Sequence, residues 1–365
     1  KVEITSNEVV YVGSEISKNE VEITAAAGGT DLNAQMIGGA NAADSLTLIG
    51  KGDTQSITAS GDLSGGTLAL TLTEAIKLNS IDISGLKGIT GDVAINLANV
   101  KHTDNKLVVD IQGSDAAEKI TANTADAAVT AITLSGDLGG GANTVTVAPT
   151  SAATGIKTID LSGLSATGGT LESTITIDAA LTAVTSIKGS AGKDTVDISA
   201  IVNADDVTID LGAGDDTFKG GVLVASKQVT VTGGEGNDTF NLTASKVTTV
   251  GTPEYTTITD FSAGDKITFA ASGITTYGNV GTVTGATLKD AIDAALAVTN
   301  VAPSITTADK AESVYGFTYN NETYLFYNKA TGSTSAAATD IVVKLSGNVD
   351  LDSISLDGAT GVTIA

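Results

Sequence analysis

The sequence predicts an all-β fold, namely a right-handed parallel β-solenoid of the β-roll or β-helix kind, with a small C-terminal α+β module that caps it. Short alternating apolar segments that end in glycine recur every 22 to 28 residues along much of the chain. The composition agrees, because Ala, Val and Ile are scattered among Thr, Ser, Gly and Asp, aromatic residues make up 4%, and Trp is absent. Mean hydropathy is +0.21, yet no stretch is apolar for long enough to span a membrane.

In residues 1–184 the repeat is degenerate, and four segments share an apolar-x-apolar-x-Gly frame. They are Ile81–Gly85, Val109–Gly113, Ile132–Gly136 and Ile159–Gly163. Each frame predicts a short strand that runs into a turn, so stacked copies would form rungs ~4.8 Å apart. We predict a degenerate solenoid here; an antiparallel β-sandwich over residues 1 to about 100 is the alternative. The acidic loops 49–53 and 113–119 could hold cations, although solvated aspartates explain them more simply.

Residues 185–269 contain three near-copies of one nine-residue phrase, Gly189–Asp197, Leu211–Lys219 and Gly233–Asn241. Their aspartates, Asp194, Asp216 and Asp238, fall 22 residues apart both times. Glycines at the second and fourth positions permit left-handed backbone, which turns successive carbonyls toward one point. The Thr-apolar pair after each aspartate predicts a strand with one side chain inward and one outward. Such a turn offers only oxygen ligands, the set that favours calcium over zinc or copper.

A related phrase, Asp260–Ile267, follows these copies and ends the run. Its Asp265 comes 27 residues after Asp238, because an insertion around Pro253 lengthens the interval.

The pattern G-G-x-G-x-D-x-(apolar)-x resembles the calcium-binding nonapeptide of repeats-in-toxin proteins. The resemblance implies Ca²⁺ as the cofactor, held by main-chain and side-chain oxygens between neighbouring coils. The implied metal-binding residues are Gly189, Ala191, Lys193, Asp194, Leu211, Ala213, Asp215, Asp216, Gly233, Glu235, Asn237, Asp238, Asp260 and Asp265. Leu211 replaces the first glycine of its phrase and Ser190 the second of another, so the Gly189 turn matches least well.

Residues 270–365 do not follow the repeat, and their residue pattern predicts the capping module. Thr287–Val298 predicts a helix with Thr287 as its N-cap, Ser313–Lys329 predicts an aromatic hairpin that turns near Asn320 and Asn321, and Asp340–Leu345 predicts a strand. We interpret the aromatic residues as a cover for the last rung rather than a sugar site. The module is similar to the terminal module of proteins exported by type I secretion, which implies an uncleaved export signal within residues 340–365.

Charge and residue usage exclude several functions. Net charge is −23 and all 19 basic residues are lysine, so nucleic-acid binding and binding to anionic membranes are disfavoured. The chain has no cysteine and a single histidine, His102, which we expect in an exposed loop; this disfavours both a Ser-His-Asp and a Cys-His constellation. We therefore expect no enzyme. A β-helical polysaccharide lyase or epimerase using paired carboxylates is the least favoured alternative.

Composition and terminal module together resemble the repeats-in-toxin surface-layer proteins of Gram-negative bacteria such as Campylobacter and Caulobacter. The resemblance implies a structural protein that leaves the cell through a type I exporter, folds on calcium and forms a calcium-bridged two-dimensional homo-oligomeric lattice on the cell surface. A polysaccharide anchor would lie in a region outside this chain, which begins at Lys1 and which we expect to be a piece of a longer one. The alternative is an adhesin or another secreted calcium-binding repeat protein of the same family.

Overall fold

A computed structural model of the chain describes residues 2–364 except 13–18, 38–43, 74–76, 99, 101–103, 204, 224–226, 247–253, 299–311, 330–334, 336, 338 and 348. The chain divides into two compact units. The first comprises residues 1–176 and 188–193, and the second comprises residues 177–187 and 194–365. Each unit is described by itself.

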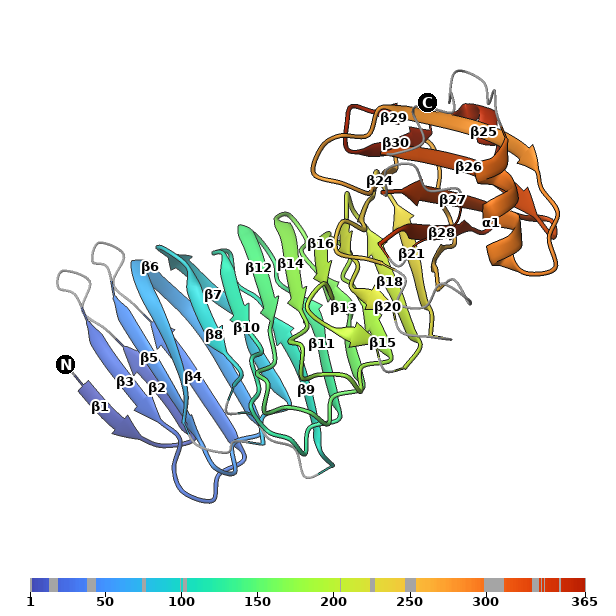
Figure 1. The fold of residues 1–365 in the computed structure, drawn as a ribbon. Coiled ribbons are helices and arrows are strands. Elements are labelled where there is room, and N and C mark those ends of the chain that lie inside the picture. The colour runs from blue at the N-terminus through green and yellow to red at the C-terminus, as the bar shows by residue number, and fades with distance from the viewer. Residues whose placement is uncertain are drawn as a thin grey trace. The chain divides into compact units, whose positions relative to one another are not determined.

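The predicted fold class is confirmed. The described chain is 55% strand with one helix, and it forms a parallel β-solenoid of about nine turns (Figure 1). Each turn contributes strands to two sheets, and the apolar side chains lie between the sheets. Among the described residues, no helix has the length and apolar character needed to cross a bilayer.

Among the described residues of the first unit, the strand pairings are parallel. One sheet contains β2 (Glu8–Val12), β4 (Asp31–Ile37), β6 (Ser56–Thr73), β7 (Ser80–Ile89), β9 (Lys106–Gln112), β11 (Ala131–Asp137) and β13 (Thr158–Ser165). Opposite it lie β1 (Val2–Thr5), β3 (Glu20–Thr24), β5 (Ser45–Lys51) and the second half of β6, followed by β8 (Val93–Asn96), β10 (Glu118–Thr121), β12 (Ala142–Val147) and β14 (Thr170–Thr176).

The register explains why the degenerate frames stack. Leu107, Ile132 and Ile159 occupy the same position of successive rungs, and each is at most 1% exposed. Equivalent apolar residues therefore form continuous columns, so each rung buries its apolar face against its own copies. The parallel rungs that begin at β1 and β2 show that this region is a solenoid and not the antiparallel sandwich considered as the alternative.

The second unit has the same coil design with shorter strands. One sheet contains β18 (Val207–Ala213), β21 (Val229–Glu235) and β23 (Thr256–Ile258), and the other contains β16 (Lys193–Asp197), β19 (Thr217–Lys219), β22 (Thr239–Asn241) and β24 (Lys266–Thr268). β15 (Ser186–Lys188) and the pair β17 (Val202–Asn203) and β20 (Val222–Leu223) complete the coils. Val196, Phe218 and Phe240 stack in one column and are fully buried, whereas the threonine before each is only half-buried. The expected in-and-out pattern after each aspartate is confirmed.

The C-terminal module covers the last rung of this unit. It contains β25 (Thr276–Thr282), α1 (Leu288–Ala297), β26 (Ser313–Tyr319), β27 (Glu322–Asn328), β28 (Ile341–Leu345), a 3₁₀ turn (Leu351–Ser353), β29 (Ile354–Asp357) and β30 (Gly361–Ile364). β28 pairs in parallel with β23, and β30 pairs antiparallel with β24, so the module extends both sheets. Tyr315, Phe317 and Phe326 are buried in a cluster with Ile292 and Leu296 of α1, which agrees with the capping interpretation.

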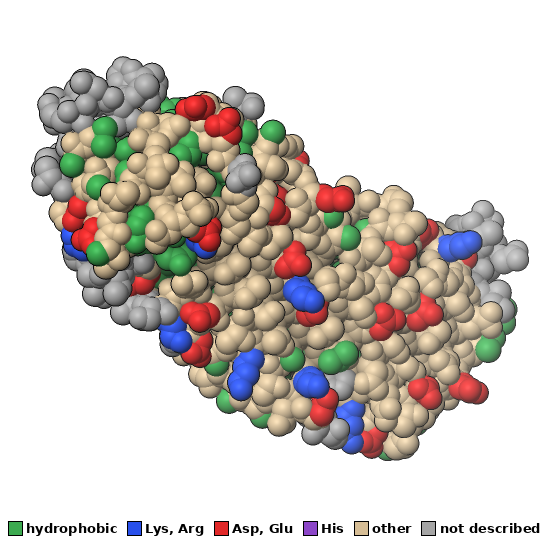
Figure 2. Space-filling model, turned by 90° about the vertical axis from the view of Figure 1, so that its right-hand side faces the viewer, with side chains coloured by type: hydrophobic (Ala, Val, Ile, Leu, Met, Phe, Trp, Pro, Cys, Tyr) green, Lys and Arg blue, Asp and Glu red, His purple; other side chains and the backbone are tan. Residues whose placement is uncertain are grey.

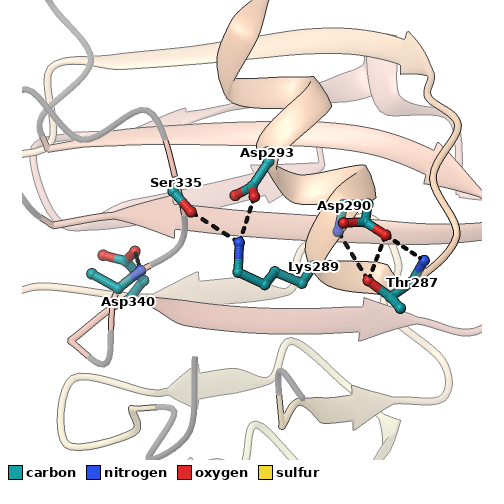
Figure 3. A network of polar contacts seen from close by, with 7 residues as sticks. Thr287, Lys289, Asp290, Asp293, Ser335 and Asp340 are labelled. Carbon is teal, nitrogen blue, oxygen red and sulfur yellow. Dashed lines mark hydrogen bonds and ion pairs between the residues drawn. The ribbon is translucent and has the colours of Figure 1, made fainter. Parts of the chain in front are cut away.

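The helix and the hairpin of this module begin and turn where the sequence predicts. Thr287 and Asp290 form a reciprocal capping box at the start of α1, and Asn320 and Asn321 adopt left-handed φ angles of 51° and 61° between β26 and β27. Around α1, Lys289 contacts Asp293 and donates to Ser335 Oγ at 3.0 Å (Figure 3).

Candidate metal site

The aspartates of the four phrases form one column at the start of successive rungs. The register pairs Thr195 with Thr217, Thr217 with Thr239 and Thr239 with Lys266, so the residues just before them are also stacked. These residues are Asp194, Asp216, Asp238 and Asp265, and their exposed fractions are 0%, 1%, 1% and 3%. Each aspartate precedes a buried apolar residue by two positions, so strand alternation directs it inward as well. We call these four residues the aspartate column.

Hydrogen bonds connect the aspartate column from coil to coil. The Asp194 N–H donates to Asp216 Oδ1 at 2.7 Å, the Asp216 N–H donates to Asp238 Oδ1 at 3.0 Å, and the Asp238 N–H donates to Asp265 Oδ1 at 2.9 Å. At the end of the column, Asp265 Oδ2 accepts the Ser262 N–H at 2.8 Å. The carboxylates of Asp216, Asp238 and Asp265 thus each satisfy a buried main-chain donor of the preceding coil.

These hydrogen bonds leave negative charge uncompensated. Asp216 Oδ2 is buried and has no hydrogen-bond partner. Burial raises the pKa of Asp216 to about 7, although the hydrogen bond from the Asp194 N–H acts in the opposite direction. Burial likewise raises the pKa of Asp238 to about 6, and the negative charges of Asp265 and Asp260 add to this. The column therefore favours protons or a bound cation over bare carboxylates.

The glycine turns bring main-chain carbonyls against the next coil. Gly234 and Gly236 have φ angles of +103° and +127°. A Cβ at Gly234 would lie 1.7 Å from the Gly212 carbonyl oxygen, and one at Gly236 would lie 1.9 Å from the Gly214 carbonyl oxygen. Only glycine fits both the backbone conformation and this close approach, so the turns place carbonyl oxygens between stacked coils.

Two further acidic residues join neighbouring turns through their side chains. Asp260 accepts the Gly233 N–H at 2.9 Å and the Gly234 N–H at 2.8 Å, and Asp215 Oδ1 accepts the Asn237 N–H at 2.8 Å. These carboxylates hold the turns of successive coils in register.

The remaining predicted ligands differ in how deeply they are buried and in the unit to which they belong. Leu211 is fully buried, so it offers only its carbonyl, whereas the side chains of Glu235 and Asn237 are exposed and Ala213 is half-buried. Gly189, Ala191 and Lys193 belong to the first unit, where the Ala191 N–H donates to the Leu164 carbonyl at 3.3 Å. His102 and Pro253 lie outside the described residues.

The turns of the second unit offer oxygen donors, namely main-chain carbonyls and aspartate carboxylates. Within the described ranges, no three His, Cys, Asp or Glu side chains converge to hold a metal ion. A cation here would therefore combine carbonyl oxygens of the turns with a carboxylate such as Asp216, whose buried Oδ2 lacks a partner. Such an all-oxygen set fits Ca²⁺ rather than zinc or copper.

Neither the scan with protein-family models nor the search of curated proteins finds a match for this chain.

Hydrogen bonds of the same kind occur in the first unit, outside the phrases. The Asn19 N–H donates to Asp44 Oδ1 at 2.9 Å, and the Glu118 N–H donates to Asn143 Oδ1 at 2.8 Å. Asp44 and Glu118 are fully buried, and each keeps one buried carboxylate oxygen without a hydrogen-bond partner. The sequence carries a signal for them, a polar residue two positions before a buried apolar one at a strand start, but it is short and common.

Without calcium, the stability of the protein is expected to fall as the pH rises from 5 to 8. The folded-state pKa of Asp216 is raised from 3.8 to about 7, so its contribution to stability is fully present below about pH 4 and is lost as the pH passes through 7. Asp216 alone should lower the free energy of unfolding by roughly 3 kcal/mol between pH 5 and pH 8. Urea unfolding in chelator at several pH values measures the trend. Stability that is flat or that rises toward pH 8 would contradict the described burial of the column.

Proposed function

We propose that the protein is a structural component of a bacterial surface layer, that it folds on binding calcium after export, and that it assembles into a two-dimensional lattice. The buried aspartate column is the observation that carries this proposal. Four stacked carboxylates, one with an unpartnered buried oxygen, favour a state in which divalent cations lie between coils. The regular coil supplies a rigid, repetitive body suited to tiling.

Calcium dependence follows from mass action. A calcium site with a dissociation constant of ~0.1 mM would add about 1.4 kcal/mol to the free energy of unfolding at an extracellular calcium concentration of ~1 mM. It would add almost nothing at the calcium concentration of the cytosol. Several such sites would contribute as much as a domain's net stability. The chain would therefore stay unfolded and exportable inside the cell and fold outside, as passage through a type I exporter requires.

The surface charge supports calcium-bridged contacts between copies of the chain. Net charge is −23, and Figure 2 shows Asp and Glu side chains spread over one face among fewer lysines. Several lysines of the chain already form ion pairs, for example Lys219 with Asp197 at 3.2 Å and Lys344 with Glu322 at 2.9 Å. Identical acidic surfaces repel one another, so divalent cations would be needed for subunits to tile.

We propose a structural rather than a catalytic role. The chain has no cysteine or arginine and one histidine, so a cysteine nucleophile is absent from the sequence and catalysis would have to rely on carboxylates, hydroxyls or lysines.

Electron microscopy of the purified full chain tests the proposal. Ordered sheets are expected in millimolar calcium, and dispersed particles are expected after chelation, because cations would bridge the acidic subunits. Separate particles in both conditions would contradict lattice assembly and would favour the second candidate, a secreted adhesin or other calcium-binding repeat protein.

A further inference from the structure

The first unit contains a buried carboxylate that none of the nonapeptide phrases includes. Glu118 is the first residue of β10 and is fully buried. Its Oε1 accepts two hydrogen bonds from Ser114, one from the N–H at 2.8 Å and one from Oγ at 2.6 Å. Its Oε2 is buried and has no hydrogen-bond partner. Ser114 thus holds one oxygen in place and leaves the other available.

Glu118 occupies the same position within its coil as each member of the aspartate column occupies within its own coil. Its N–H donates to Asn143 Oδ1 at 2.8 Å, and Asn143 lies at the paired position of the next rung. The Asp194 N–H makes the same bond to Asp216 at 2.7 Å in the second unit. A shared position and a shared hydrogen bond make the Glu118 turn a structural counterpart of the phrases.

The turn before Glu118 also stacks against glycines. Gly139 and Gly141 of the next coil have φ angles of +71° and +79°. A Cβ at Gly139 would lie 2.4 Å from the Ser114 carbonyl oxygen, and one at Gly141 would lie 2.7 Å from the Ala116 carbonyl oxygen. As at Gly234 and Gly236, glycine permits carbonyl oxygens to lie between coils.

A groove of about 420 Å³ lies beside this turn, and its lining includes Ser114, Asp115 and Gly139 as well as Lys87, but not Glu118. Burial, together with the negative charge of Asp115, raises the pKa of Glu118, whereas the hydrogen bonds from Ser114 act in the opposite direction. The nearby carboxylate of Asp137 already accepts the N–H groups of Gly139 and Thr167.

We propose that Glu118 Oε2 and the main-chain carbonyls of residues 113–117 form a second kind of divalent-cation site, one that lacks the nonapeptide. All the available donors are oxygens, namely the Glu118 carboxylate and main-chain carbonyls of the turn, and such a set takes Ca²⁺. The site extends cation binding to the first unit, and it is independent of lattice assembly.

Counting bound calcium ions on the full chain tests this site. Equilibrium dialysis against calcium alone is carried out on the wild type, on Glu118→Gln and on a control, Glu172→Gln, which makes the same charge change at an exposed position of β14. Glu118→Gln is expected to bind one ion fewer per chain, and Glu172→Gln as many as the wild type. Equal numbers for all three proteins would overturn the proposal.

A third variant, Asp216→Asn, separates this site from the calcium sites of the proposed function. Loss of ions in Asp216→Asn but not in Glu118→Gln would overturn the Glu118 site alone. Loss in Glu118→Gln but not in Asp216→Asn would support the Glu118 site and count against the aspartate column.

The melting temperature verifies that Glu118→Gln folds. Glutamine keeps an oxygen acceptor for Ser114 and removes a buried charge, so the variant in chelator should melt no lower than the wild type. Its rise in melting temperature on adding calcium should be smaller than that of the wild type. A rise equal to that of the wild type would overturn the proposal.

Discussion

The Asp216→Asn variant is expected to lose most of the stability that calcium adds and yet to be no less stable than the wild type in chelator at pH 8. Asparagine keeps an oxygen acceptor for the Asp194 N–H and removes a buried charge whose pKa is raised to about 7. Asp216 lies between two neighbouring coils of the column, so its loss should weaken two adjacent cation sites. The free energy of unfolding in millimolar calcium should then fall by about 3 kcal/mol. Urea unfolding with calcium and with chelator measures both effects.

A matched control for this variant lies in the same coil. Asp210→Asn makes the same charge change at an exposed position of β18. The control should respond to calcium as the wild type does. If both variants keep the full calcium response, the buried column is not where calcium acts.

Gly234→Ala should disrupt the turn at the centre of the repeat. The new Cβ would lie 1.7 Å from the Gly212 carbonyl oxygen, and φ at this position is +103°. Clash and backbone strain together should cost about 3 kcal/mol or more, because the carbonyl belongs to a stacked coil that cannot move alone. Urea unfolding in calcium measures the loss.

Gly168→Ala isolates the backbone contribution to that loss. Gly168 has a similar φ of +86°, but its Cβ would meet nothing within 4 Å. Its cost should therefore be only ~1–2 kcal/mol. Equal losses at the two positions would show that the close stacking of coils at Gly234 carries no stability of its own.

The solenoid could be predicted because its coils repeat a local rule. Residues such as Ile132 and Ile159 alternate with polar neighbours and run into glycine turns, and the same pattern buries them in columns. The helix and hairpin were predictable for a similar reason, since Thr287 with Asp290 and the Asn320-Asn321 pair are local signals. Local chemistry alone determines these elements.

Features that depend on the spacing between coils were not predictable. Glu118 is matched with Asn143 only because one coil happens to hold 25 residues, and no nonapeptide marks either of them. The 18-residue strand β6 passes from one sheet to the other and pairs with β4 and then β5. Its glycines Gly61 and Gly65, at φ +122° and +84°, permit this bend, but glycine in a strand does not by itself reveal which sheet the next residues join.

The most direct test of calcium binding is a high-resolution crystal structure of the chain grown in calcium, with anomalous differences measured at long wavelength. We expect a calcium peak within bonding distance of Asp216 Oδ2, coordinated by carbonyl oxygens of the neighbouring glycine turns. A carboxylate at Asp216 that contacts only water or protein, in crystals that contain millimolar calcium, would contradict it.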